Sequence, residues 1–212
     1  PPSKEQVEQM QEGSVFMGFL WPKENEELVE ALRKQGVTSI AMECVPRISR
    51  AQKLDALSSM SNVSGYRAVI EAAYYYGSFF NAQFTAAGRV DQAKVLVIGA
   101  GVAGLAAAGA ARGLGAKVYA FDVRAAAREQ VESMGAEFVE VEFEESGDGE
   151  GGYAKVMSDE FIAAEMALFR KLAAEMDIVI TTALIPGRPA PKLWLNEAVA
   201  EMKPGSVVVD LA

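Results

Sequence analysis

The chain has 212 residues, half of them hydrophobic, which is enough for a sizeable core in one large domain or in one and a half smaller ones. Its 29 acidic residues outnumber its 20 basic residues, and the net charge of −9 argues against a nucleic-acid partner. The chain has no histidine, which excludes a Ser/His/Asp group and a His-ligated metal, and its single cysteine excludes disulfides and a zinc cluster. We expect that cysteine, Cys44, to be a small buried side chain.

The first part of the chain alternates between helix and strand patterns. The expected order is helix 3–11, strand 14–21, helix 25–36 and strand 38–45. A polar stretch over 47–62 follows, and then an apolar helix over 64–83. In that helix Tyr66, Val69, Ala73 and Phe80 fall near one face, which predicts a core or subunit-contact helix.

From Lys94 the alternation becomes regular. The expected strands are 93–100, 116–123, 136–143, 177–184 and 206–212, and the helices between them are 101–115, 124–135, 158–175 and 190–202. Strands separated by helices predict an α/β, doubly wound parallel sheet. We therefore expect a partial N-terminal α/β domain with a long connecting helix over 1–85 and a Rossmann-like domain over 86–212. The chain starts without methionine and ends on a strand pattern, so we expect a fragment of a longer protein.

A glycine-rich turn joins the first strand of the second domain to its first helix. Gly99, Gly101 and Gly104 form the pattern G-x-G-x-x-G, with Val102 and Ala103 at the start of the helix. Such glycines permit a tight turn, close approach of a pyrophosphate and close packing of helix on strand. The free N–H groups of the helix N-terminus favour an anion. The motif therefore predicts a dinucleotide site.

Asp122 ends the second strand of that domain, 23 residues after Gly99. A carboxylate there can accept hydrogen bonds from the adenosine ribose, and it would repel a 2′-phosphate by on the order of a few kcal/mol. This favours NAD(H) over NADP(H), although Arg124 is a residue type that can accept a 2′-phosphate. The alternative is that Asp122 only caps the next helix.

Two segments could hold a nicotinamide. Residues 181–191 follow the fourth strand at its carboxyl end, where ligands lie in open α/β sheets. Residues 47–59 supply Arg47, Gln52, Asp55 and Ser58, of which the last three are spaced by three and would share one helix face. The alternative for this segment is a solvated first turn with a capping role.

These residues resemble a known family over residues 12–212. The similar segments are RISRAQ, DALSSMSNVSGYRAV, VIGAGVAGLAAAGAARGLGA, FDVRAAAREQVESMGAEF, ESGDGEGGYAKVMSDEF, TTALIPGRPAP and KPGSVVVDLA. They resemble the NAD(H)-binding component of proton-translocating nicotinamide nucleotide transhydrogenase. The resemblance implies two Rossmann-like domains with NAD(H) between them, and a chain that lacks part of the first domain and everything after Ala212.

The resemblance also implies an activity and partners. Hydride would pass between NAD(H) on this component and NADP(H) on a partner component, while a membrane component moves a proton. It implies a homodimer at the periphery of the mitochondrial inner membrane or the bacterial cytoplasmic membrane, facing matrix or cytoplasm. Gln52 would hold the two nicotinamides in register. The other implied contacts are Arg47, Asp55 and Ser58 at the nicotinamide and its ribose, Asp122 at the adenosine ribose, Val123 at the adenine, and Thr182, Ala183 and Leu184 at the nicotinamide end.

Two other functions stay open: an alanine dehydrogenase-like oxidoreductase, and a non-catalytic NAD(H)-sensing module. The acidic, glycine-rich segment before Tyr153 favours the transhydrogenase, because we expect no counterpart of it in alanine dehydrogenase. Residues 137–150 hold seven carboxylates and no basic residue, and glycines follow at 147, 149, 151 and 152. Loops this long in a compact domain are usually binding elements, so we expect a lid with Tyr153 at its tip rather than a plain surface connection.

Overall fold

The structure is a computed structural model that describes residues 1–46, 48–143, 147, 155, 157–184 and 189–212. The chain divides into two compact units, Pro1–Met60 and Ser61–Ala212. Helix α3 (Ala56–Tyr75) begins in the first unit and continues in the second. The boundary expected between residues 85 and 86 stays a prediction.

The first unit contains a pair of parallel strands with two helices. Its elements are α1 (Lys4–Glu8), β1 (Val15–Gly18), α2 (Glu26–Lys34), β2 (Thr38–Ala41) and the 3₁₀ helices η1 (Met42–Cys44) and η2 (Ser49–Leu54). Leu28 and Leu32, one turn apart on α2, pack in a small core with Val7, Leu20 and Val37. The strand expected over 38–45 is shorter than predicted, because the chain turns into η1 after Ala41. Cys44 lies on that turn and is exposed, so the expectation that it is buried was wrong.

Helix α3 starts earlier and ends earlier than its sequence pattern predicted. It begins at Ala56 and ends at Tyr75, two residues before Gly77. Its buried face consists of Gly65, Ala68, Val69 and Ala72, whereas Tyr66 is 58% exposed. The buried face of the helix therefore differs from the predicted one. The prediction placed an aromatic residue in the core, whereas small residues occupy that position.

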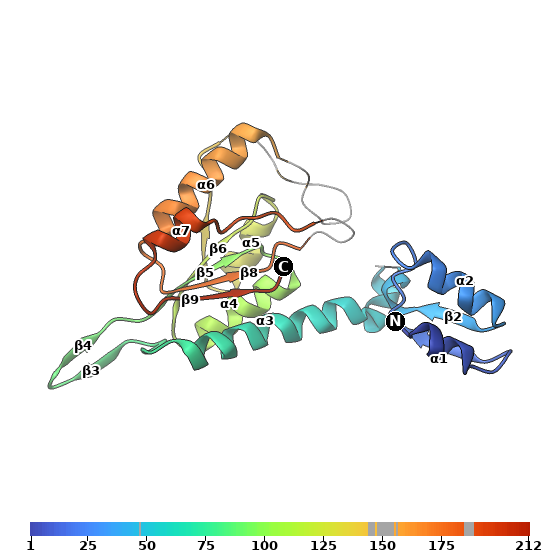
Figure 1. Cartoon of the computed structure of the whole chain (residues 1–212). Helices are drawn as coiled ribbons and strands as arrows, with labels where there is room; N and C mark the ends of the chain where they lie inside the picture. Colours follow the sequence, from blue (N-terminus) through green and yellow to red (C-terminus); the bar gives the residue numbers. More distant parts are fainter. Residues whose placement is uncertain (47, 144–146, 148–154, 156, 185–188) are drawn as a thin grey trace. The chain divides into compact units, whose positions relative to one another are not determined.

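A β-hairpin that the sequence pattern did not reveal follows α3. Strands β3 (Gln83–Thr85) and β4 (Gly88–Val90) pair antiparallel, with Thr85 opposite Gly88. Gly88 has a φ of +141°, which a residue with a side chain rarely adopts. Figure 1 shows the hairpin extending away from the large sheet of the second unit. The predicted helix over 64–83 includes only Gln83 of this hairpin.

Five parallel strands form the sheet of the second unit. They are β5 (Lys94–Ile98), β6 (Lys117–Phe121), β7 (Glu137–Val139), β8 (Ile178–Thr181) and β9 (Val207–Asp210), in the spatial order β7-β6-β5-β8-β9. The chain builds outward from β5 to β7 and then returns to the other side of β5, so the strand order reverses between β5 and β8. The predicted α/β Rossmann-like class is confirmed, although β7 stops at Val139 and is shorter than expected.

Helices cover both faces of this sheet (Figure 1). They are α4 (Val102–Gly113), α5 (Ala127–Ser133), α6 (Asp159–Ala173) and α7 (Asn196–Glu201). Successive strand residues point to opposite faces: Val95 and Val97 of β5 join the core cluster that contains α3, α4 and α5 residues, while Leu96 and Ile98 join the cluster with α6. Both faces are thus buried, which explains the unbroken apolar runs of the strands.

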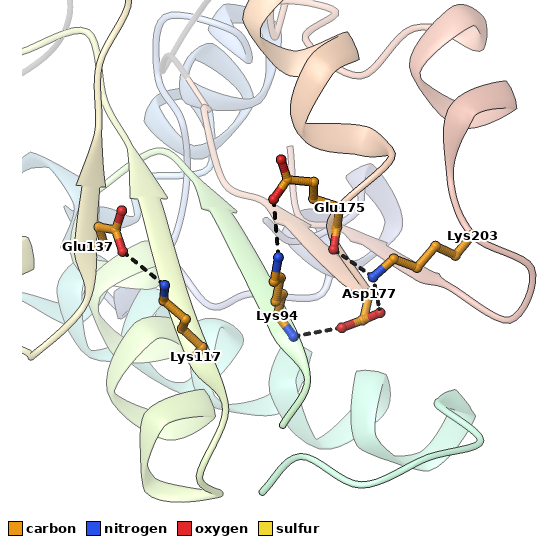
Figure 2. Close-up of polar contacts among 6 residues, drawn as sticks. All are labelled: Lys94, Lys117, Glu137, Glu175, Asp177 and Lys203. Carbon is orange, nitrogen blue, oxygen red and sulfur yellow. Dashed lines mark hydrogen bonds and ion pairs between the residues drawn. The ribbon is translucent and has the colours of Figure 1, made fainter. Parts of the chain in front are cut away.

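Ion pairs tie together the amino ends of the strands (Figure 2). Lys94 binds Glu175 at 3.1 Å through Nζ, and its backbone N–H donates to Asp177 at 2.8 Å. Lys203 donates to the other Asp177 oxygen at 2.8 Å, and Lys117 lies 3.3 Å from Glu137. Such partly exposed pairs are each worth about 0–1 kcal/mol. They occupy the edge opposite the glycine-rich turn, which leaves the carboxyl ends of the strands for a ligand.

Candidate functional site

The glycine-rich turn lies where the strand order reverses. Gly99 has a φ of +97°, and a Cβ there would lie 2.7 Å from the hydroxyl oxygen of Thr182. A Cβ on Gly104 would lie 1.7 Å from the Gly99 carbonyl oxygen. At Gly101, by contrast, a Cβ would meet nothing within 4 Å. The first and third glycines are therefore required by packing, and the middle one borders open space.

Thr182 holds the turn from the side of β8. Its N–H donates to the Ile98 carbonyl at 2.8 Å, and its hydroxyl donates to the Gly99 carbonyl at 2.8 Å. The backbone nitrogen of Ala183 would lie 3.2 Å from a Cβ on Gly99. Two of the residues predicted for the nicotinamide end thus lie beside the turn, and the third, Leu184, is 58% exposed.

The carboxylate of Asp122 accepts several hydrogen bonds. Oδ2 accepts the N–H of Ala100 at 2.8 Å, and Arg124 donates to the same carboxylate from its backbone, Nε and Nη2 at 2.9, 2.8 and 2.7 Å. Four donors are as many as the lone pairs of a carboxylate accept. A ribose hydroxyl can therefore reach Asp122 only by replacing one of them. The capping alternative is not seen, because α5 begins after Ala126 without a side-chain cap.

Val123 packs against a residue of the acidic segment. Gly147 is buried and donates its N–H to the Val123 carbonyl at 3.0 Å. A Cβ on Gly147 would lie 2.4 Å from that oxygen and 2.6 Å from the Val123 side chain. The proposed adenine contact is thus joined to the start of the glycine-rich segment. Tyr153, and with it the expected lid, lies outside the described residues.

The remaining predicted residues belong to the first unit. Gln52 is exposed on η2, Asp55 lies between η2 and α3, and Ser58 is in the first turn of α3. Asp55 accepts the N–H of Ser58 at 2.9 Å and its hydroxyl at 2.6 Å, so it caps α3. The three residues do not share one helix face as expected, because the chain changes from a 3₁₀ helix to an α-helix between them. Arg47 lies outside the described residues.

The groups around the turn fit a dinucleotide. The open space at Gly101 would admit a phosphate close to the backbone, and α4 begins at Val102, so its first N–H groups have no helical partner. Sequence reasoning identified the glycines but missed what supports them. Neither the Ala100 N–H bond to Asp122 nor the Thr182 hydroxyl bond follows from a pattern, because each joins residues at least 22 positions apart.

A doubly wound parallel sheet with a glycine-rich turn at its topological switch point defines a dinucleotide-binding protein of the Rossmann-like class. Two family models match the chain: the alanine dehydrogenase/PNT N-terminal domain over residues 1–64 and the alanine dehydrogenase/PNT C-terminal domain over residues 68–212. The chain therefore belongs to the alanine dehydrogenase/PNT family.

Both transhydrogenase subunits and alanine dehydrogenases are among the relatives of this chain. NAD(P) transhydrogenase subunit alpha of Cereibacter sphaeroides is 61% identical over the whole chain, which spans 41% of that protein. Alanine dehydrogenase of Mycolicibacterium smegmatis is 33% identical, again over the whole chain and 52% of the relative. A crystal structure of transhydrogenase from Sinorhizobium meliloti matches with 47% sequence identity and a TM-score of 0.84. The match covers the whole of this chain and 56% of the chain in that crystal structure. The chain thus spans about half the length of these relatives.

Within the described part of the chain, none of the helices combines the length and the apolar character that a bilayer crossing requires.

Proposed function

We propose that this chain is the NAD(H)-binding part of a proton-translocating NAD(P) transhydrogenase. The observation that carries the proposal is the glycine-rich turn at the switch point, held by Thr182 and by the Ala100 contact with Asp122. The 61% identity to a transhydrogenase alpha subunit, against 33% to an alanine dehydrogenase, supports this branch of the family.

The contribution of the chain to the reaction is positioning. The bound dinucleotide supplies the hydride chemistry. The first N–H groups of α4 would hold the pyrophosphate, Asp122 the adenosine ribose and Val123 the adenine, while Thr182, Ala183 and Leu184 border the nicotinamide end. Arg47, Gln52, Asp55 and Ser58 would hold the nicotinamide and its ribose, with Gln52 keeping it in register with the partner nucleotide. Alignment of two reacting groups can lower a barrier by about 7–11 kcal/mol, so no histidine or other proton donor is needed.

The preference for NAD(H) depends on the pair formed by Asp122 and Arg124. The side chain of Asp122 is only 7% exposed, and its ion pair with Arg124 is 2.7 Å long. The pair is neutral as a whole, so it repels a 2′-phosphate less than a lone carboxylate would. We propose that a ribose hydroxyl replaces one Arg124 donor on binding, and that Asp122, once released from part of this pair, selects NAD(H).

We further propose a homodimer that works with an NADP(H)-binding component and with a membrane component that moves the proton, at a mitochondrial inner or bacterial cytoplasmic membrane.

An exposed apolar surface supports the homodimer. No residue between Glu71 and Arg89 is charged, and four aromatic side chains in this stretch are 51–80% exposed: Tyr74, Tyr75, Phe79 and Phe84. At about 200 Å² each they offer about 500 Å² per copy, against the roughly 800 Å² per partner of a standard interface. The guanidinium of Arg89 lies 5.3 Å from the centre of the Phe84 ring and is paired with Asp91. Little net charge therefore opposes contact between two copies of this surface, even in a chain of net charge −9.

The test mixes the intact protein that contains this chain with an NADP(H)-loaded partner component. We expect hydride transfer from NADH to an NADP⁺ analogue, and no oxidation of alanine. Pyruvate-dependent oxidation of NADH would instead establish an alanine dehydrogenase. Binding of NADH without turnover in either assay would identify a sensing module.

A further inference from the structure

We propose that Gly65 on α3, outside the glycine-rich motif, positions the pyrophosphate-binding turn. The inference rests on the nucleotide site proposed above, since it assigns a role to a residue that supports that site. Gly65 and the turn belong to the same compact unit, Ser61–Ala212.

At Gly65 the backbones of two helices touch. A Cβ on Gly65 would lie 1.9 Å from the carbonyl oxygen of Ala103, 2.7 Å from its carbonyl carbon and 3.0 Å from its Cα. Ala103 is the second residue of α4 and lies between the second and third glycines of the motif. Figure 1 shows α3 passing along α4. Only a residue without a side chain allows α3 to approach the first turn of α4 this closely.

Packing on either side of the contact holds α3 in place. Ala68, Val69 and Ala72 of α3 are at most 2% exposed, and they belong to the same core cluster as Ala107 and Ala111 of α4. In a close-packed core a helix cannot move outward to admit an extra methyl group without losing these contacts. An overlap at Gly65 would therefore be transmitted to Ala103, whose backbone carries one of the N–H groups of the anion site.

The turn is thus supported from three directions. Thr182, which follows β8, donates to the Gly99 carbonyl, and Asp122, which follows β6, accepts the Ala100 N–H. Gly65 supplies the support from the side of α3, on the helical half of the turn. The geometry of the donors, and not only their presence, decides how well they bind an anion.

The chain offers a matched control at Gly109. It is also a helical glycine, on α4 itself, and a Cβ there would meet only the terminal Cε of Met134, at 2.5 Å. The end of a methionine side chain can move aside, whereas a backbone carbonyl cannot. Replacing either glycine by alanine favours the helix equally, so a difference between the two variants reports the contact and not helix propensity.

The experiment measures binding of ADP-ribose, which carries the pyrophosphate, and of adenosine, which does not. Both dissociation constants are determined for the intact wild-type protein and for Gly65→Ala and Gly109→Ala. We expect Gly65→Ala to weaken ADP-ribose at least tenfold and adenosine less than twofold, and Gly109→Ala to change both less than twofold. Equal weakening of both ligands by Gly65→Ala would mean general loss of structure and would overturn the positioning role, as would unchanged ADP-ribose binding.

If Gly65→Ala does not fold, Val69→Ala tests whether the packing of α3 positions the pyrophosphate-binding turn. This variant loosens the same helix without an overlap, and we expect it to weaken ADP-ribose two- to fivefold and to leave adenosine unchanged. An unchanged ADP-ribose constant in a folded Val69→Ala protein would overturn the inference. Failure of the nucleotide site itself is distinguishable, because in that case the wild-type protein would bind neither NADH nor ADP-ribose.

Discussion

Glu165 is a buried carboxyl group on the apolar face of α6. It is 4% exposed and lies one turn from both Phe161 and Phe169. No basic side chain of the described residues pairs with it, and burial raises its pKa to about 7. We predict that Glu165→Gln removes a pH-dependent loss of stability that the wild-type protein shows between acid and mildly alkaline pH.

The sign and size of the effect follow from proton linkage. Below the ordinary value of 4.5 the carboxyl is protonated in both states and contributes no pH dependence. Between 4.5 and the folded pKa of about 7, only the folded chain keeps the proton, so the free energy of unfolding falls by about 1.4 kcal/mol per pH unit. Above that range the loss is constant at about 3 kcal/mol, or about 2 kcal/mol if the surroundings relax around the charge.

The assay is urea unfolding at pH values from 4.5 to 8.5, followed by tryptophan fluorescence, to which Trp194 contributes. That indole packs 6.0 Å from the ring of Phe169 and so reports on the same core. The wild-type protein should lose about 2–3 kcal/mol more than Glu165→Gln as the pH rises. Parallel curves for the two proteins would refute the reasoning, since they would mean that Glu165 titrates alike in the folded and unfolded chains.

Three further predictions concern the proposed function. Asp122→Asn should weaken NADH about tenfold in a fluorescence titration, because an amide cannot accept all the hydrogen bonds at this carboxylate; unchanged affinity would show that the assignment to the ribose is wrong. Gln52→Asn, one methylene shorter, should slow hydride transfer at least tenfold while the dissociation constant for NADH changes much less. Parallel loss of rate and affinity would make Gln52 a binding residue only. Phe84→Glu should raise the dissociation constant of the dimer at least tenfold in sedimentation velocity, because it removes an aromatic ring from the proposed interface and puts in its place a carboxylate that the interface would have to desolvate; a dimer of unchanged stability would exclude that surface.

The pattern of the second unit was predictable because its information is local. An apolar strand followed by a helix recurs along the chain, and neighbouring residues alone define each element. The turn at Gly99 was predictable for the same reason, since its three glycines lie within six residues. The β3–β4 hairpin was missed because each of its strands is only three residues long, and strand pairing depends on residues across the turn.

The sequence by itself determined the class of fold, the glycine-rich turn and the acidic residue that follows β6. The tertiary structure decided how these parts support one another: Arg124 occupies the carboxylate of Asp122, Thr182 fastens Gly99, and the backbone at Gly65 meets that of Ala103. Except for the pair formed by Arg124 and Asp122, these contacts join residues far apart in the chain. The contact at Gly65 depends on an absent side chain, which leaves no periodic signal. The spacing of residues along the sequence determines which helix or strand forms. Only the packing of these elements in the folded chain shows which backbone atoms come into contact.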